Sequence, residues 1–172
     1  HTDYVFQSVG MQYFFRIGNA GLSQVDISTG HFPHKGEVEF IDYKHFDGVQ
    51  LFFLQPTPEF GNRIKQFGTL PYYEFSTTEA YLELHYEHFF EGFLLSRIGF
   101  FRRAQLHALA GFNTLHLANG RFYSEVVTGF SNILKIMRLE YSMGSGNDLE
   151  LQHTVRLGLD LDYLYYRNNQ VN

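Results

Sequence analysis

The sequence contains no cysteine, no tryptophan and no long run of apolar residues, and these absences exclude several kinds of protein. Without cysteine there is neither a disulfide framework nor a thiolate metal site. No run approaches the roughly 18 to 20 apolar residues that a transmembrane helix requires. A role in a membrane would therefore need a β-barrel, which crosses the bilayer with strands.

Charge is also scarce. Only 18% of the residues are charged and the formal net charge is −5, so no basic surface predicts nucleic acid as a partner. The spacings of a Ser-His-Asp triad, a phosphate loop and a dinucleotide fingerprint are all missing. The sequence therefore predicts a protein that is not an enzyme and uses no cofactor.

A metal site is not expected either. His85 and His88 are three residues apart, so on a strand their side chains point to opposite faces. Three further histidines lie between residues 30 and 69, where a metal-binding or pH-sensing role stays open. Ordinary hydrogen-bonded histidine is the simpler interpretation of all five.

What the chain does have is aromatic residues: 19 Phe and 12 Tyr, far more than a typical soluble domain carries. A Phe-rich turn with arginines lies between residues 89 and 101. At a membrane surface, rings lie at headgroup depth and long cations reach outward. The alternative is a docking surface for a periplasmic partner. The predicted interfacial anchor consists of Phe89, Phe93, Arg97, Phe100 and Phe101.

Apolar and polar residues alternate over several stretches, and a period of two is the period of a β-strand. In residues 137–143, for example, the odd positions are apolar and the even ones polar. Turn residues such as Ala118-Asn119-Gly120 separate the stretches, and Gly144 to Asp148 also has the composition of a loop. The predicted strands are 4–15, 23–29, 70–90, 103–115, 122–131, 137–143 and 151–161.

Two segments fall outside this pattern, and neither suggests a domain boundary. Residues 30–69 contain three of the four prolines and no sustained alternation, so they predict one long loop that is functional or disordered. Residues 162–172 form a polar, Tyr-rich tail. We therefore expect one structural unit over residues 1–172. Because residue 1 is His and not an initiator Met, we also expect upstream sequence to exist.

The polar face of the predicted strands carries charged residues, as the wall of a water-filled lumen would. Short connections on one side and a long loop on the other are typical of outer-membrane barrels. These features predict that the apolar face contacts lipid and the polar face lines a lumen. A soluble barrel or sandwich, with the apolar face inside, stays open as the alternative. The predicted lumen wall includes Glu83, Glu125, Arg138 and Arg156.

Several motifs also occur in an order that resembles a known family. They are DYKHFDG at 42–48, LPYYEFST at 70–77, HYEHFFEGF at 85–93, Arg97-Ile98 and FSNILK at 130–135. Together they resemble the C-terminal half of a family of Gram-negative outer-membrane barrels with an N-terminal carboxypeptidase-regulatory-like domain. That family is similar to the bacterial surface antigen superfamily, which includes outer-membrane protein insertion and two-partner secretion translocators. The match covers most of residues 30–161.

This resemblance implies an all-β fold: an antiparallel transmembrane barrel of about 16 strands, of which this chain supplies about seven. Seven strands cannot close in lipid, so the remaining strands are expected from upstream sequence. The superfamily's Val/Ile-Arg-Gly-Phe/Tyr loop signature is absent, which puts insertion activity in doubt. By position, the lumen-loop motif would be Asp42, Tyr43, Lys44, His45, Phe46, Asp47 and Gly48.

The function implied is that of an outer-membrane barrel related to protein insertion or translocation. Strand 151–161 would be the lateral seam, and Lys44 would dock on the wall near Glu83 and Glu125, so that Lys44→Glu loosens the loop. The alternative is a structural or receptor-like barrel within a larger complex, which a fully hydrogen-bonded last strand would favour. The expected partners are the lipid bilayer and the remaining strands, and other outer-membrane or periplasmic proteins are candidates.

Overall fold

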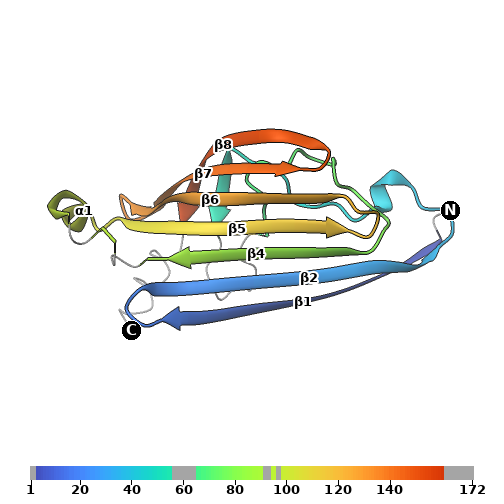
Figure 1. Ribbon diagram of the computed structural model, residues 1–172, viewed down its shortest axis with the longest axis horizontal. Helices are drawn as coiled ribbons and strands as arrows, with labels where there is room; N and C mark the ends of the chain where they lie inside the picture. Colours follow the sequence, from blue (N-terminus) through green and yellow to red (C-terminus); the bar gives the residue numbers. More distant parts are fainter. Residues whose placement is uncertain (1–2, 56–64, 91–93, 96–97, 161–172) are drawn as a thin grey trace.

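In the computed structural model the chain is described over residues 3–55, 65–90, 94–95 and 98–160. It is all-β with very little helix, and the strands form one curved sheet (Figure 1). The strands are β1 (Tyr4–Ile17), β2 (Gly21–Lys35), β3 (Phe52–Gln55), β4 (Tyr81–Phe89), β5 (His107–Leu117), β6 (Phe122–Ile133), β7 (Met137–Gly146) and β8 (Leu149–Asp160); the helices are the 3-10 helix η1 (Phe40–Asp42) and α1 (Gly99–Ala104).

The spatial order of the strands is β1-β2-β4-β5-β6-β7-β8-β3. The first seven of these pair antiparallel, each with its neighbour, whereas β3 runs parallel to the end of β8. The sheet is not closed, because β1 and β3 form its two edges. The predicted seven-stranded antiparallel arrangement is confirmed to this extent.

The short connections also lie where turn residues predicted them. Gly18 and Gly120 have positive φ angles in the β1–β2 and β5–β6 turns, where a residue without a Cβ is favoured. Asn132, Leu134 and Lys135 take positive φ in the β6–β7 turn. No helix in the described ranges is long and apolar enough to span a membrane.

Four predicted boundaries were wrong, and the first two concern the long loop. The loop does not begin at Gly30, because β2 continues to Lys35: Phe32 is buried and packs on Phe6, with ring centroids 4.8 Å apart. Nor does a strand begin at Leu70, since residues 71–75 form a turn with Tyr73 at φ 64°. The connection between β2 and β4 is therefore residues 36–80, called the covering segment below.

The other two corrections concern strand ends. Residues 99–104 form α1, so the strand expected from Arg103 begins only at His107. Gly144 to Gly146 belong to β7 and not to the predicted loop. A Cβ on Gly144 would lie 2.6 Å from the Thr69 hydroxyl oxygen, so this glycine permits close approach of another segment.

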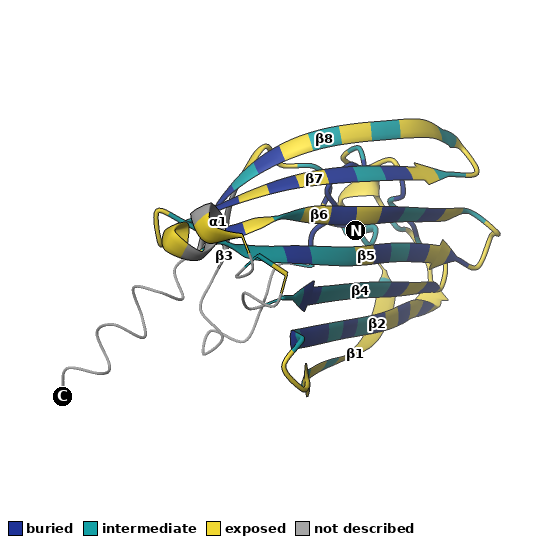
Figure 2. Ribbon diagram, turned by 60° about the vertical axis from the view of Figure 1, so that its left-hand side comes forward, coloured by how far each residue is buried: buried dark blue, intermediate teal, exposed yellow. Residues whose placement is uncertain are grey.

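Buried and exposed residues alternate along several strands (Figure 2), and the two faces of the sheet have opposite character. We call the face against which the covering segment packs the covered face and the other the open face. The covered face buries polar side chains, including Asp26, Ser28, Glu83, Asn113, Glu125, Arg138, Glu140, Ser142 and Arg156. The open face exposes large apolar ones, including Val9, Met11, Leu82, Phe112, Val126, Leu139, Tyr141, Leu151, Val155 and Leu159.

An apolar cluster joins the covering segment to the sheet near the strand ends. Its centre is Tyr123, which is fully buried with Phe67 5.5 Å and Phe75 6.0 Å away between ring centroids. The covering segment thus packs against the sheet through an apolar cluster that both contribute to. The buried members are Phe46, Phe67, Leu70, Phe75, Tyr81, Leu115, Leu117 and Tyr123.

Candidate functional site

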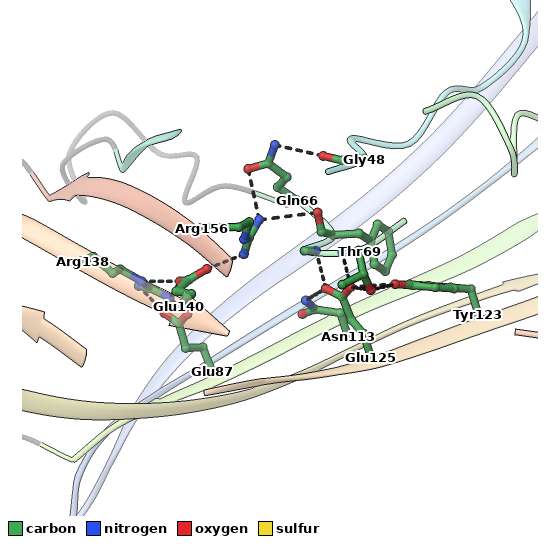
Figure 3. Close-up of polar contacts among 12 residues, drawn as sticks. Gly48, Gln66, Thr69, Glu87, Asn113, Tyr123, Glu125, Arg138, Glu140 and Arg156 are labelled. Atoms are coloured by element: carbon green, nitrogen blue, oxygen red, sulfur yellow. Dashed lines mark hydrogen bonds and ion pairs between the residues drawn. The ribbon is translucent and has the colours of Figure 1, made fainter. Parts of the chain in front are cut away.

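Glu125 is the point at which the covering segment is held to the sheet (Figure 3). Its two carboxylate oxygens accept hydrogen bonds from the backbone N–H groups of Gly68 at 2.6 Å and Thr69 at 2.9 Å. Asn113 Nδ2 at 2.7 Å and the Tyr123 hydroxyl at 2.8 Å donate to it from the sheet. Glu125 is 2% exposed, so a buried carboxylate with this many donors is satisfied by hydrogen bonds.

The close approach of the covering segment to the sheet requires glycine at two positions. A Cβ on Gly68 would collide with the side chain of Ser142 on β7. A Cβ on Gly144 would meet Thr69 and the Tyr123 hydroxyl, which themselves contact each other. These two glycines therefore allow the backbone of the covering segment to reach the wall of the sheet.

A chain of alternating charges lies beside Glu125 on the covered face (Figure 3). Arg138 pairs with both Glu87 and Glu140, and Arg156 Nη2 is 2.5 Å from Glu140 Oε2. Because two positive charges alternate with two negative ones, the chain has no net charge. That compensation is what buried charges require.

Arg156 also extends the chain to the covering segment. Its Nη1 lies 3.4 Å from Gln66 Oε1 and 3.5 Å from the Phe67 carbonyl oxygen. Gln66 in turn donates from Nε2 to the Gly48 carbonyl at 3.0 Å. The buried charges of β7 and β8 are therefore connected through side chains to both halves of the described covering segment.

The predicted wall residues Glu83, Glu125, Arg138 and Arg156 all lie on the covered face, each with 5% exposure or less. Glu83 accepts hydrogen bonds from Ser28 Oγ at 2.9 Å and is 3.0 Å from His85 Nε2. These partners of Glu83 lie on β2 and β4, whereas Arg138 and Arg156 both pair with Glu140 on β7.

The first part of the predicted lumen-loop motif contacts the rim of the sheet. Asp42 ends η1 and accepts a 3.4 Å hydrogen bond from the Tyr4 hydroxyl. The ring of Tyr43 packs on Phe40, with centroids 5.5 Å apart. His45 Nδ1 is 2.7 Å from the hydroxyl oxygen of Ser76.

The second part of the motif lies deeper. Lys44 pairs through its backbone with Thr77, and its Nζ lies 5.0 Å from the Phe46 ring centroid. Phe46 is buried, Asp47 forms a backbone bridge with Gln66, and Gly48 accepts the Gln66 bond described above. All seven motif residues thus belong to the covering segment.

Lys44 was predicted to dock on the wall near Glu83 and Glu125. Lys44 lies close enough to Glu83 for electrostatic attraction. Glu125 is reached instead by Gly68 and Thr69, which lie 24 and 25 residues after Lys44 in the chain. Gln66 to Thr69 were not among the residues predicted from sequence, and a Gly-Thr pair among aromatic residues is the one local signal there.

The predicted interfacial anchor is only partly described. Phe89 is half-buried, and the Arg138 guanidinium lies 5.4 Å from its ring centroid, so its ring is near the covered face. Phe93 and Arg97 lie outside the described residues, as do the side chains of Phe100 and Phe101 in α1. Within the described residues, no group of three or more His, Asp or Glu side chains could hold a metal ion.

Comparison with known proteins gives one relationship. No curated protein and no solved structure matches the chain. A family model described as "Family of unknown function (DUF5686) C-terminal domain" matches residues 1–130, which is more than half of the sequence. The chain therefore belongs to the DUF5686 family, in its C-terminal domain.

Proposed function

We propose that this domain is part of a transmembrane β-barrel in a bacterial outer membrane, with the covering segment inside the lumen. The observation that carries the proposal is the inverted polarity of the sheet. Glu125, Glu140 and Arg156 are 5% exposed or less, whereas Val126 and Val155 are 48% and 60% exposed on the opposite face.

In water this arrangement is unfavourable, because burying a charge is costly and exposing a wide apolar face forgoes hydrophobic stabilisation. In a bilayer the same arrangement is favourable: the open face meets acyl chains, and the covered face surrounds a polar interior. The strand lengths support this, since β5 to β8 have 10 to 12 residues and about 9 to 11 are enough to cross a bilayer.

The outer edge of β1 and the part of β8 before Leu157 then require further strands, because unsatisfied backbone groups cost several kcal/mol each in lipid. Among the described residues, β1 has no partner on its outer side. We propose that other strands of the same barrel complete the ring.

We propose further that the barrel is related to those that insert or translocate proteins, with β8 at the seam. Such a seam has to open sideways. One observation favours the alternative of a structural or receptor-like barrel: β3 pairs with residues 157–160 of β8, so this part of the seam strand has partners on both sides. The polar contacts of Glu125 with the covering segment fit either function.

The test uses the absence of native cysteine in this domain. Single cysteines are introduced in the full-length protein at Val126 on the open face or at Thr154 on the covered face, and an environment-sensitive fluorophore is attached. We expect the label at position 126 to emit at shorter wavelength and to be quenched by doxyl-labelled lipid in vesicles. The label at position 154 is the matched control and should not be quenched by that lipid. Water-like emission at position 126 would refute the proposed barrel.

A further inference from the structure

The open face carries one hollow among its described residues that the proposed barrel does not explain. It has a volume of about 270 Å³ and lies where β4 and β5 pair beside the end of β1. None of its lining residues carries a formal charge when histidine is neutral. Its walls are Ile17, Tyr86, His88, Phe90, Ala110 and Phe112, with Gly111 between the last two.

The polar atoms beside the hollow form an ordered chain of hydrogen bonds. His88 Nε2 lies 3.2 Å from the carbonyl oxygen of Ala20, and a carbonyl can only accept. Nε2 therefore carries a hydrogen, as in the Nε2–H tautomer of imidazole. Nδ1 then accepts from the hydroxyl of Ser23, which is 2.7 Å away.

This chain ends at Tyr86. Its hydroxyl lies 3.3 Å from Ser23 Oγ, well beyond the usual 2.7 to 2.8 Å of a bond between hydroxyls. Because the Ser23 hydrogen is donated to His88, Tyr86 is the donor of this long bond. Its hydrogen is thus weakly engaged at the edge of the hollow, where a better acceptor can take it.

The geometry also argues against nucleophilic catalysis by Ser23 with His88 as its base. Ser23 has no exposed surface and does not line the hollow, so its oxygen cannot reach a bound molecule. A nucleophile needs such access. The hollow is therefore suited to holding a ligand and not to cleaving one.

We propose that this hollow binds one acyl chain of a membrane glycerophospholipid, whose ester carbonyl accepts the Tyr86 hydroxyl hydrogen. The inference rests on the proposed barrel. The hollow is continuous with the exposed apolar surface around Phe112, it is smaller than a pocket for a whole drug-sized ligand, and the Tyr86 hydroxyl at its edge is held only by the long bond to Ser23. The turn between β1 and β2 is nearby, at the end of the sheet where β4 ends and β5 begins (Figure 1). The Tyr86 hydroxyl contacts Ser23, two residues from that turn, so it lies closer to the strand ends than Phe112 and Val126 do. Ester groups lie at that level when strands end at the bilayer surface.

The absence of tryptophan provides a direct test. Phe112→Trp puts a single reporter in the wall of the hollow within this domain. Met143→Trp puts the control reporter at the same level on the same face, because Phe112, Val126 and Met143 are successive register partners across β5, β6 and β7. Each full-length variant is titrated in detergent micelles with a glycerophospholipid that carries brominated acyl chains.

We expect half-maximal quenching of the Trp at position 112 at about one tenth of the lipid mole fraction needed at position 143. In the Phe112→Trp background, Ala110→Phe should abolish this difference by filling the hollow, and Val155→Phe on β8 should not. Tyr86→Phe should reduce the preference several-fold for the brominated phospholipid but not for a brominated alkane, which has no ester.

The outcomes separate this inference from the barrel itself. Equal quenching at positions 112 and 143 means ordinary contact with lipid around the barrel, which overturns the acyl-chain site and leaves the barrel standing. No quenching at either position refutes both. A preference at position 112 that survives Ala110→Phe also overturns the site.

Discussion

At the scale of single residues, Glu125 joins the covering segment to the sheet by hydrogen bonds. Its carboxylate is the acceptor for two consecutive backbone N–H groups of that segment, those of Gly68 and Thr69. Two such N–H groups need two acceptor atoms in fixed positions, and an ionised carboxylate provides them. No residue of the predicted lumen-loop motif makes this contact.

Glu125→Gln should therefore loosen the covering segment. The amide nitrogen of glutamine cannot accept, so one of the two N–H groups loses its buried partner at a cost of about 3 kcal/mol. We expect faster hydrogen exchange in peptides that cover residues 65–77, measured by mass spectrometry on the full-length protein.

Glu150→Gln is the matched control for this variant. Glu150 is exposed on β8, and the same chemical change there should leave exchange in residues 65–77 unaltered. Unchanged exchange in Glu125→Gln as well would mean that the apolar cluster around Tyr123, and not the carboxylate, holds the segment.

At the scale of elements, the sheet contains one parallel strand pair among antiparallel ones. β3 belongs to the covering segment, yet it pairs with residues 157–160 of β8, and the Leu157 N–H donates to the Leu51 carbonyl at 2.8 Å. β3 thus occupies the place where a strand closing the barrel would pair. Whether it holds that place in the full-length protein decides between a seam that is free to open and one that is covered.

A double-cysteine variant tests this pairing. Phe52 and Leu157 are register partners, and neighbouring strands lie about 4.8 Å apart, within the range that a disulfide spans. Oxidation of Phe52→Cys with Leu157→Cys should therefore give an intramolecular crosslink, seen as a mobility change without reductant.

The control pair is Phe52→Cys with Val155→Cys, which is two residues out of register, roughly 7 Å further along β8. It should crosslink poorly. Equal crosslinking in the two pairs, or none in the first, would show that β3 is not fixed on β8. In that case the seam is open and the translocation proposal gains support over the structural one.

At the scale of the whole molecule, the effect of a charge on the open face depends on whether that face contacts lipid or water. Val126 lies near the middle of β6 and is 48% exposed on this face. In the proposed barrel, Val126→Arg puts a charge near the bilayer midplane, at a cost of about 2 to 4 kcal/mol. The expected result is a lower denaturant midpoint for the protein refolded in lipid vesicles.

Leu134→Arg makes a similar change at a residue that is 80% exposed in the turn between β6 and β7. Outside the strands the cost should be about 0 to 1 kcal/mol. A soluble protein would tolerate both substitutions alike, since the open face would already be in water. Equal midpoints for the two variants would therefore contradict the membrane assignment.

The sequence alone was enough to predict the seven antiparallel strands and their two faces, because both are local, but not β3 or every strand end. Alternation with period two is a property of consecutive residues, and it correctly placed Glu125, Arg138 and Arg156 on one face and Val126 and Leu139 on the other. The turn at Gly120 was predicted for the same reason, from residues that favour its backbone angles.

Only the tertiary structure decided what covers the polar face, because that depends on contacts between residues far apart in the chain. Thr69 and Glu125 meet although 56 residues separate them, and Arg156 and Gln66 are 90 apart. The same contacts explain two wrong boundaries. Gly144 was predicted in a loop, but it is a strand glycine that lets Thr69 approach. Leu70 was predicted in a strand, but it is buried in the apolar cluster of the covering segment. Local pattern determined the sheet, and long-range packing determined the covering segment, since neither hydrogen bonds nor burial between distant segments leave a periodic trace in sequence.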